Sequence, residues 1–157
     1  MSPKAHPGRK TNATAHPITM LAIDPGEVHC GFAYFRGDEC IEAGEWDPPT
    51  LLARVEHDVT HDVVDEVVIE EFELYPWKSQ EQGFSQLRTV RVIGALEYVC
   101  ARFGRPTLVV VFQKAIIKKP TVGQNTARKY KWVSRGHGGH AKDAETHGLY
   151  RVQKGRS

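Results

Sequence analysis

The chain has 157 residues and a mass of 17.6 kDa, which suits one domain and leaves no room for two of ordinary size. Hydrophobic residues make up 40% and charged residues 25%, which excludes a disordered or collagen-like chain, and three cysteines without CxxC spacing argue against a disulfide framework or a zinc cluster. The net charge of +2 hides an asymmetry, because residues 1–100 hold 8 Lys and Arg against 17 Asp and Glu, whereas residues 101–157 hold 13 against 2. So basic a C-terminal third indicates a polyanionic partner, above all nucleic acid, with pairing between acidic and basic surfaces as the alternative.

The first 17 residues show no apolar periodicity, and we interpret residues 1–17 as a flexible arm outside the fold. They hold no apolar stretch, so we expect no secretory signal and a cytoplasmic protein. No apolar run approaches the roughly 20 residues that cross a bilayer, so we expect no membrane span. The folded domain is predicted over residues 18–152, followed by a basic tail over 153–157.

The hydrophobic pattern predicts a mixed α/β protein. In the first half we expect a buried strand over 18–24, a hairpin of strands over 29–36 and 39–45, and a helix over 50–57 capped by Thr50. In the second half we expect a strand over 66–72, a helix over 85–103, a strand over 107–112 and helices near 126–133 and 140–152. The apolar positions of the 85–103 helix are Leu87, Val90, Ile93, Leu96, Cys100 and Phe103. This order of elements is typical of a sheet whose faces are covered by helices.

Two acids stand at the ends of apolar strands. Asp24 and Glu70 each close such a run, and a carboxylate at the edge of a core must be paired, hydrogen-bonded or bound to a cation. Asp143, one of two acids in the basic third, follows His140 by three residues, so both can face one site from a helix. Three carboxylates and an imidazole without a thiolate suit Mg²⁺ or Mn²⁺. Two such ions support phosphodiester hydrolysis.

Several alternatives stay open at this stage. Glu71 can replace Glu70, because successive strand side chains face opposite ways. His147 can add to the site, whereas His140 and His137 can simply be solvated in a glycine-rich segment. Each acid taken singly can also be a solvated surface residue.

Three motifs in order resemble those of a known family. LAIDPGEVHCGFAYF, VVIEEF and HAKDA resemble the acidic motifs of RuvC-type Holliday junction resolvases, within the ribonuclease H-like (retroviral integrase) superfamily. FQKAIIKKPTVGQNTARKYKWV resembles the basic segment of that family, and the likeness spans about residues 18 to 150. After Ala144 the chain departs from the family, which has small apolar residues where this chain has Glu145-Thr146-His147-Gly148.

The resemblance implies a ribonuclease H-like fold, with a mixed five-stranded sheet and helices on both faces. It implies that Asp24, Glu70 and Asp143 are catalytic carboxylates that bind two Mg²⁺ or Mn²⁺ ions, with His140 as a further catalytic and metal-binding residue. It also implies a homodimer that cuts four-way DNA junctions in recombination and repair, with the 85–103 helix as the dimer surface. A non-catalytic nucleic-acid-binding protein, or a nuclease for flaps, other branched DNA or RNA, is the alternative.

Basic side chains gather in the segment before the last acidic motif. We expect a phosphate track there, in which such residues supply affinity without reading sequence. Two aromatic residues that follow the Glu70 strand can stack on unpaired bases, although core packing is the alternative for Phe72. The predicted DNA-binding residues are Lys114, Lys118, Lys119, Arg128, Lys129, Lys131, Arg135, Phe72 and Tyr75. Lys142 belongs to the same basic cluster.

Overall fold

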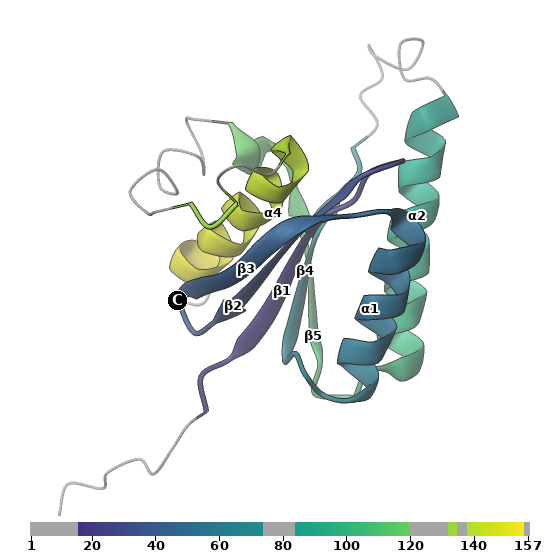
Figure 1. The fold of residues 1–157 in the computed structure, drawn as a ribbon. Coiled ribbons are helices and arrows are strands. Elements are labelled where there is room, and N and C mark those ends of the chain that lie inside the picture. Colours follow the sequence, from purple (N-terminus) through teal and green to yellow (C-terminus); the bar gives the residue numbers. More distant parts are fainter. Residues whose placement is uncertain (1–15, 74–83, 120–131, 135–137, 156–157) are drawn as a thin grey trace, which may run out of the picture.

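The computed structural model describes residues 16–73, 84–119, 132–134 and 138–155, with side chains of α2 described from residue 87. The chain folds as one sheet between two helical layers (Figure 1). The strands are β1 (Thr19–Asp24), β2 (Cys30–Arg36), β3 (Glu39–Trp46), β4 (Glu66–Glu71) and β5 (Val109–Lys114). The helices are α1 (Pro48–Thr60), α2 (Phe84–Phe103) and α4 (Gly139–Tyr150), with a 3₁₀ turn η2 (Ala115–Lys118) and a π-helical turn η4 (Arg151–Gly155).

The five strands lie in the order β3-β2-β1-β4-β5. β1, β2 and β3 form an antiparallel meander, and β1, β4 and β5 are parallel. The meander follows from the tight turn at Gly37, whose φ of +63° a glycine adopts without strain. The parallel pairs follow from α1 and α2, which supply the crossovers that parallel strands require. The predicted mixed five-stranded sheet with helices on both faces is confirmed.

The alternation of side chains along the strands builds two cores. Leu21 and Ile23 of β1 pack with α1 and α2, whereas Met20 and Ala22 pack toward α4. In β4, Val67 and Ile69 belong to the first core and Val68 to the second. Because successive residues alternate, Asp24 and Glu70 lie on the α4 face, while Glu71 lies on the α2 face.

The helix α1 begins earlier than the sequence predicted. Asp47 is its N-cap residue and accepts a hydrogen bond from the Thr50 backbone N–H at 3.0 Å. The prediction that Thr50 caps the helix was wrong, because Pro48 and Pro49 fit the first helical turn, where no N–H partner is needed.

The helix α2 packs on the sheet through part of the predicted apolar stripe, namely Ile93, Leu96 and Cys100. Its buried residues include Val92, Leu96, Val99 and Cys100. Leu87, Val90 and Phe103, which the predicted apolar stripe included, are 57%, 40% and 38% exposed. The helix therefore carries apolar residues on two sides, and those of the second side are partly exposed.

The helix α4 lies close against the sheet. A Cβ added at Gly31 of β2 would stand 1.8 Å from the carbonyl oxygen of His140, and one at Gly148 would stand 2.0 Å from the Phe35 ring. Ala141 and Ala144 are fully buried in the same contact. These small residues let the helix pack closely and fix the height of α4 above the strand ends.

Other boundaries shift by one or two residues. The strand expected over 107–112 is β5 at Val109–Lys114, because residues 106 and 107 form a turn. The helix expected near 126–133 falls mostly outside the described residues, and Val133 itself lies in a turn. Helical structure continues through Gly155, beyond the predicted boundary at residue 152. No helix in the described part of the chain is long and apolar enough to span a membrane.

Candidate active site

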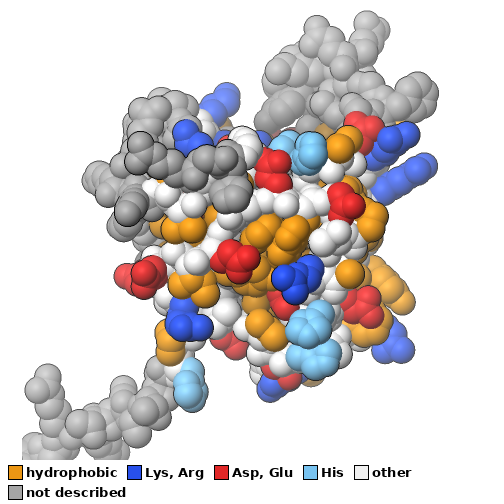
Figure 2. All heavy atoms as spheres, viewed as in Figure 1, with side chains coloured by type: hydrophobic (Ala, Val, Ile, Leu, Met, Phe, Trp, Pro, Cys, Tyr) orange, Lys and Arg blue, Asp and Glu red, His pale blue; other side chains and the backbone are white. Residues whose placement is uncertain are grey.

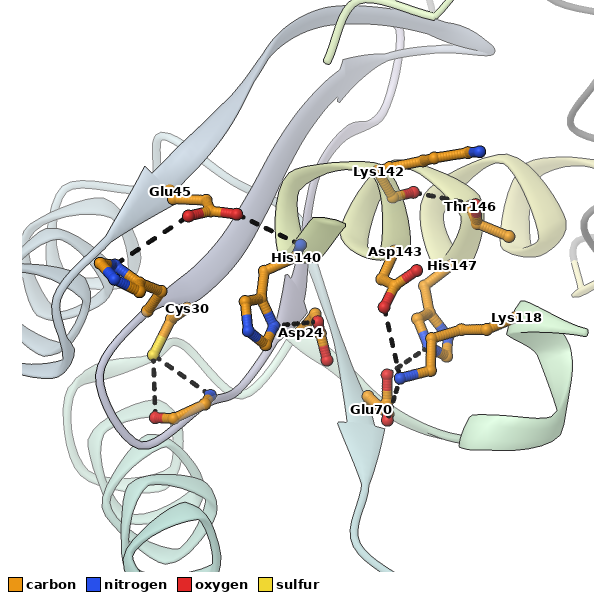
Figure 3. A network of polar contacts seen from close by, with 12 residues as sticks. Asp24, Cys30, Glu45, Glu70, Lys118, His140, Lys142, Asp143, Thr146 and His147 are labelled. Atoms are coloured by element: carbon orange, nitrogen blue, oxygen red, sulfur yellow. Dashed lines mark hydrogen bonds and ion pairs between the residues drawn. The ribbon is translucent and has the colours of Figure 1, made fainter. Parts of the chain in front are cut away.

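The candidate site lies at the carboxyl ends of β1 and β4, beneath α4. These strands are parallel neighbours paired from Met20 with Glu66 to Ile23 with Ile69, so their terminal acids Asp24 and Glu70 emerge side by side. Figure 3 shows His140, Asp143 and His147 reaching toward them from one face of α4. Residues at positions i, i+3 and i+7 share a helix face, which explains why one helix supplies all three.

His140 joins α4 to Asp24. Its Nδ1 lies 2.7 Å from Oδ2 of Asp24, whose side chain is 4% exposed. Its backbone N–H donates to Oε1 of Glu45 in β3 at 3.2 Å, so a carboxylate from the sheet satisfies the first turn of α4. A Cβ at Gly138, the N-cap position, would stand 2.2 Å from that same carboxylate oxygen. The start of α4 is therefore fixed by close contact with β3.

Glu70 contacts two nitrogen donors, one on each carboxylate oxygen. Nζ of Lys118 lies 3.0 Å from Oε1, and Nε2 of His147 lies 3.0 Å from Oε2. The same ammonium of Lys118 lies 3.4 Å from Oδ2 of Asp143. Lys118 therefore bridges the two acids and brings Asp143 into the cluster, as Figure 3 shows.

The electrostatics of the two strand-end acids differ. Burial raises the pKa of Asp24 to about 6, aided by the neighbouring carboxylate of Glu70 and opposed by the hydrogen bond with His140. Burial also acts on Glu70, but hydrogen bonds from His147 and Asp24 and the charge of Lys118 outweigh it and lower its pKa to about 2. Below about pH 6 the two acids therefore hold one proton between them, on Asp24, and above that pH both are ionised. The hydrogen bond to Asp24 raises the pKa of His140, although burial opposes it.

The donor set suits a hard divalent cation. Asp24, Glu70 and Asp143 offer only oxygen ligands, and two of them are largely buried like charges whose repulsion a cation would relieve. A cation already lies between Glu70 and Asp143, namely the Lys118 ammonium. In the described residues no three His, Cys, Asp or Glu side chains form a ready-made metal cluster. Metal binding would therefore require Lys118 to leave the carboxylates.

The structure brings together all four residues that the sequence singled out, Asp24, Glu70, His140 and Asp143. It separates Glu71 from them, because Glu71 lines a groove with Val90 and Ile93 on the α2 face. His147, left open by the sequence, contacts Glu70 directly.

Sequence reasoning missed Glu45 and Gln113 and assigned Lys118 only to DNA. The sole available signal for Gln113 was its position on the strand next to Glu70, since the two residues pair in register.

The segment Glu145-Thr146-His147-Gly148 now has a structural reason. The buried carboxylate of Glu145 accepts the backbone N–H groups of Val133 and Ser134, both at 2.8 Å. The ammonium of Lys142 lies 5.3 Å from the centroid of the Trp132 ring. These contacts attach the end of the basic segment to α4, which apolar residues at these positions could not do.

Four of the predicted DNA-binding residues lie in the described part of the chain. Lys114 lies 3.8 Å from the Glu73 carboxylate, Lys118 is in the site, and Lys119 is exposed just after η2. Phe72 is half-buried in the groove beside α2 rather than displayed on a loop. The other five, Tyr75, Arg128, Lys129, Lys131 and Arg135, lie outside the described residues.

No protein-family model matches the sequence, and no curated protein sequence matches it either. Solved structures do match. Thermus thermophilus RuvC bound to a Holliday junction has a TM-score of 0.62 at 17% identity, covering 86% of this chain and 92% of that one. The fowlpox virus resolvase bound to Holliday junction DNA has a TM-score of 0.50 at 13% identity, covering 89% of this chain and all of that one.

The chain has the fold of RuvC-type resolvases. A second Thermus thermophilus RuvC structure agrees, with a TM-score of 0.60 over 88% of this chain. The predicted ribonuclease H-like fold is thereby confirmed over nearly the whole length of both chains. At identities of 13–17% this likeness concerns the fold, and the chemistry depends on the residues at the strand ends.

Proposed function

We propose that the protein is a divalent-metal-dependent endonuclease that resolves four-way DNA junctions by phosphodiester hydrolysis. The observation that carries the proposal is the convergence of Asp24, Glu70, His140 and Asp143 at the strand ends of a RuvC-type fold. RuvC and the fowlpox virus resolvase were each solved with Holliday junction DNA. The basic C-terminal third supplies the charge that such a substrate requires.

In this proposal the three carboxylates hold Mg²⁺ or Mn²⁺, two ions per site. The ions would activate a water and stabilise the departing oxygen during in-line attack on phosphorus. Asp24 lies deepest and would bind as the ionised carboxylate, the form that predominates above about pH 6. His140 already uses Nδ1 on Asp24, so Nε2 is the ring nitrogen that it can offer to an ion or to the substrate. Lys118 would leave Glu70 and contact a phosphate of the DNA.

A homodimer fits the same proposal, because two opposed strands of a junction must be cut and one chain has one carboxylate cluster. α2 supplies a candidate surface: Leu87, Val90 and Tyr98 are 57%, 40% and 62% exposed, and nothing lies within 4 Å of a Cβ at Gly94. These positions follow one another at helical spacings of three and four. In Figure 2 hydrophobic side chains reach the edge where α2 runs. Such a stripe is typical of a two-fold helix contact.

We expect DNA to bind on another face than the proposed dimer surface and the face shown in Figure 2. The face in Figure 2 shows acidic and basic side chains interspersed around a hydrophobic centre, which is no phosphate track. We propose that the DNA lies over the carboxylate cluster, where Lys118 ends η2, Lys119 follows it and Lys142 lies on α4. Lys114, Arg128, Lys129, Lys131 and Arg135 would extend this track, and Tyr75 would stack on unpaired bases. The burial of Phe72 beside α2 favours core packing for that residue.

The decisive experiment is a cleavage assay on a labelled four-way junction, a flap and plain duplex, with Mg²⁺, Mn²⁺ or EDTA. We expect paired incisions in the junction with metal and none with EDTA. Glu70→Gln should abolish cleavage, while Glu71→Gln, the same change on the opposite face of the strand, should not. Preferential cutting of the flap would redirect the substrate assignment. Junction binding without cleavage in any metal would refute the nuclease and favour a binding protein.

A further inference from the structure

His147 is the most deeply buried polar side chain near the site and has partners on both ring nitrogens. Its side chain is 0% exposed. Nε2 lies 3.0 Å from Oε2 of Glu70, and Nδ1 lies 2.8 Å from Oε1 of Gln113. It follows Asp143 by one helical turn and points from α4 to the same strand ends as His140. A buried imidazole of this kind has one fixed orientation.

The direction of the bond to Glu70 does not depend on the orientation of the Gln113 amide. An ionised carboxylate only accepts, so Nε2 must carry the proton that it donates to Glu70. If Gln113 presents its oxygen, Nδ1 carries a proton as well; if the amide is reversed, Nδ1 accepts from its NH₂ group. In both cases His147 donates to Oε2, and Gln113 holds the far side of the ring.

Gln113 occupies this place for a reason that the sheet provides. Gln113 of β5 pairs in register with Glu70 of β4, so both side chains leave the sheet on the same face, beneath His147. Gln113 is 7% exposed, and a buried amide without a partner would be costly. Glu70 of β4, His147 of α4 and Gln113 of β5 are therefore connected by hydrogen bonds across three elements.

The two oxygens of Glu70 have partners of different mobility. Oε1 contacts Lys118, a flexible side chain that is 29% exposed, whereas Oε2 contacts the fully buried His147. If a metal ion displaces Lys118, the contact with His147 remains. A carboxylate held by one oxygen keeps its direction while the other is available to a ligand.

We propose that His147 is a positioning residue that holds Glu70 for metal binding, with Gln113 fixing its ring. This inference rests on the proposed nuclease function. His147 reaches the metal through Glu70 and is itself no ligand. Hydrogen-bond partners of metal-binding carboxylates contribute about 10–100-fold to metal affinity, so its removal should be measurable without any DNA.

The test compares His147→Asn with His147→Gln. Both introduce a neutral amide, but the glutamine amide reaches the position of Nε2 and can donate to Glu70, whereas the asparagine amide reaches only the position of Nδ1. Mn²⁺ binding to the DNA-free protein is measured by electron paramagnetic resonance, with Asp24→Asn to identify the signal of this site. We expect the dissociation constant to rise about 10–100-fold in His147→Asn and to stay within about threefold of the original in His147→Gln.

A control separates positioning from general stability. Leu149→Val removes one methylene from a buried position of the same helix, so it should lower the melting temperature without changing Mn²⁺ binding. Equal Mn²⁺ affinity in both His147 variants, or a loss of affinity that merely follows the melting temperature, would overturn the positioning role. If either result is found while the unmodified protein still binds Mn²⁺, the proposed metal site is retained and only the role of His147 is rejected. If the unmodified protein neither binds Mn²⁺ nor cleaves any junction, both proposals fail.

Discussion

Replacing Asp24 by asparagine should inactivate the nuclease and stabilise the metal-free protein. The pKa of Asp24 rises from 3.8 to about 6 because the group is buried, and Glu70 adds to this rise. At about 1.4 kcal/mol per pKa unit, ionising Asp24 in the folded state costs about 3 kcal/mol. Asparagine has nearly the same shape and no charge, so at pH 8 it should recover part of this cost. A gain of about 1–3 kcal/mol corresponds to a rise of several degrees in melting temperature.

The pH dependence of this effect has a definite sign. The folded-state pKa lies above the unfolded value, so the stability that protonated Asp24 contributes is complete below about pH 3.8. It is lost as the pH rises through about 6. The difference between Asp24→Asn and the unmodified protein should therefore be largest near pH 8 and vanish toward pH 4. With Mn²⁺ present, the unmodified protein should become more stable than Asp24→Asn, because a bound ion stabilises only the protein that binds it.

Thermal denaturation in EDTA at pH 4, 6 and 8 measures the stability difference and its pH dependence. Titration with Mn²⁺ then measures the effect of the metal. Asp143→Asn is the matched control, since it makes the same change in a side chain that is 34% exposed and paired with Lys118. It should leave stability unchanged or lower it slightly, because it removes an ion pair. The reasoning is refuted if Asp24→Asn is no more stable than the original at pH 8, or if its advantage does not change with pH.

Three further predictions follow from the site and its surroundings. Glu70→Gln should reduce cleavage by more than about 100-fold, beyond the range for outer hydrogen-bond partners, while Glu71→Gln stays close to the original; an equal reduction in the two variants would contradict the assignment. Replacing Lys118 and Lys119 together by alanine should weaken binding similarly across DNA sequences and lower the slope of log affinity against log salt by about one for each phosphate that these lysines neutralise; an unchanged slope would show that neither lysine binds a phosphate. Val90→Glu should leave the fold intact, because Val90 is 40% exposed, and convert a dimer into a particle near 17.6 kDa by light scattering; a monomer of the unmodified protein at concentrations that fully resolve junctions would exclude the dimer.

The strands and the acids at their ends could be predicted from the sequence because both depend on local pattern. ITMLAID and EVVIEEF each contain a short apolar run that ends in an acid, and runs of this kind form central strands covered on both faces. The choice between Glu70 and Glu71 could not be made, since a shift of one residue exchanges the two faces. Only the pairing of Ile23 with Ile69 fixes the register.

Other features depended on contacts that no local pattern encodes. The period of α2 and the burial of Leu96 were predicted, but the helix has two apolar sides. Val92 and Val99 are buried beside Leu96, whereas Leu87 and Val90 are exposed. Lys118 enters the carboxylate cluster because η2 turns the chain back after β5. These placements arise only once the sheet and α4 are assembled.

The helix α4 explains how the side chains of the site are held together. Its charged and polar face carries His140, Asp143 and His147, and the adjacent stripe of Ala141, Ala144 and Gly148 packs on the sheet. Because these stripes belong to one rigid helix, the small residues that set its height also set the distances from His140 to Asp24 and from His147 to Glu70. Two buried carboxylates side by side would otherwise repel each other. Each is instead paired with an imidazole of α4, so the packing of this helix on the sheet also brings the partners that the two acids need.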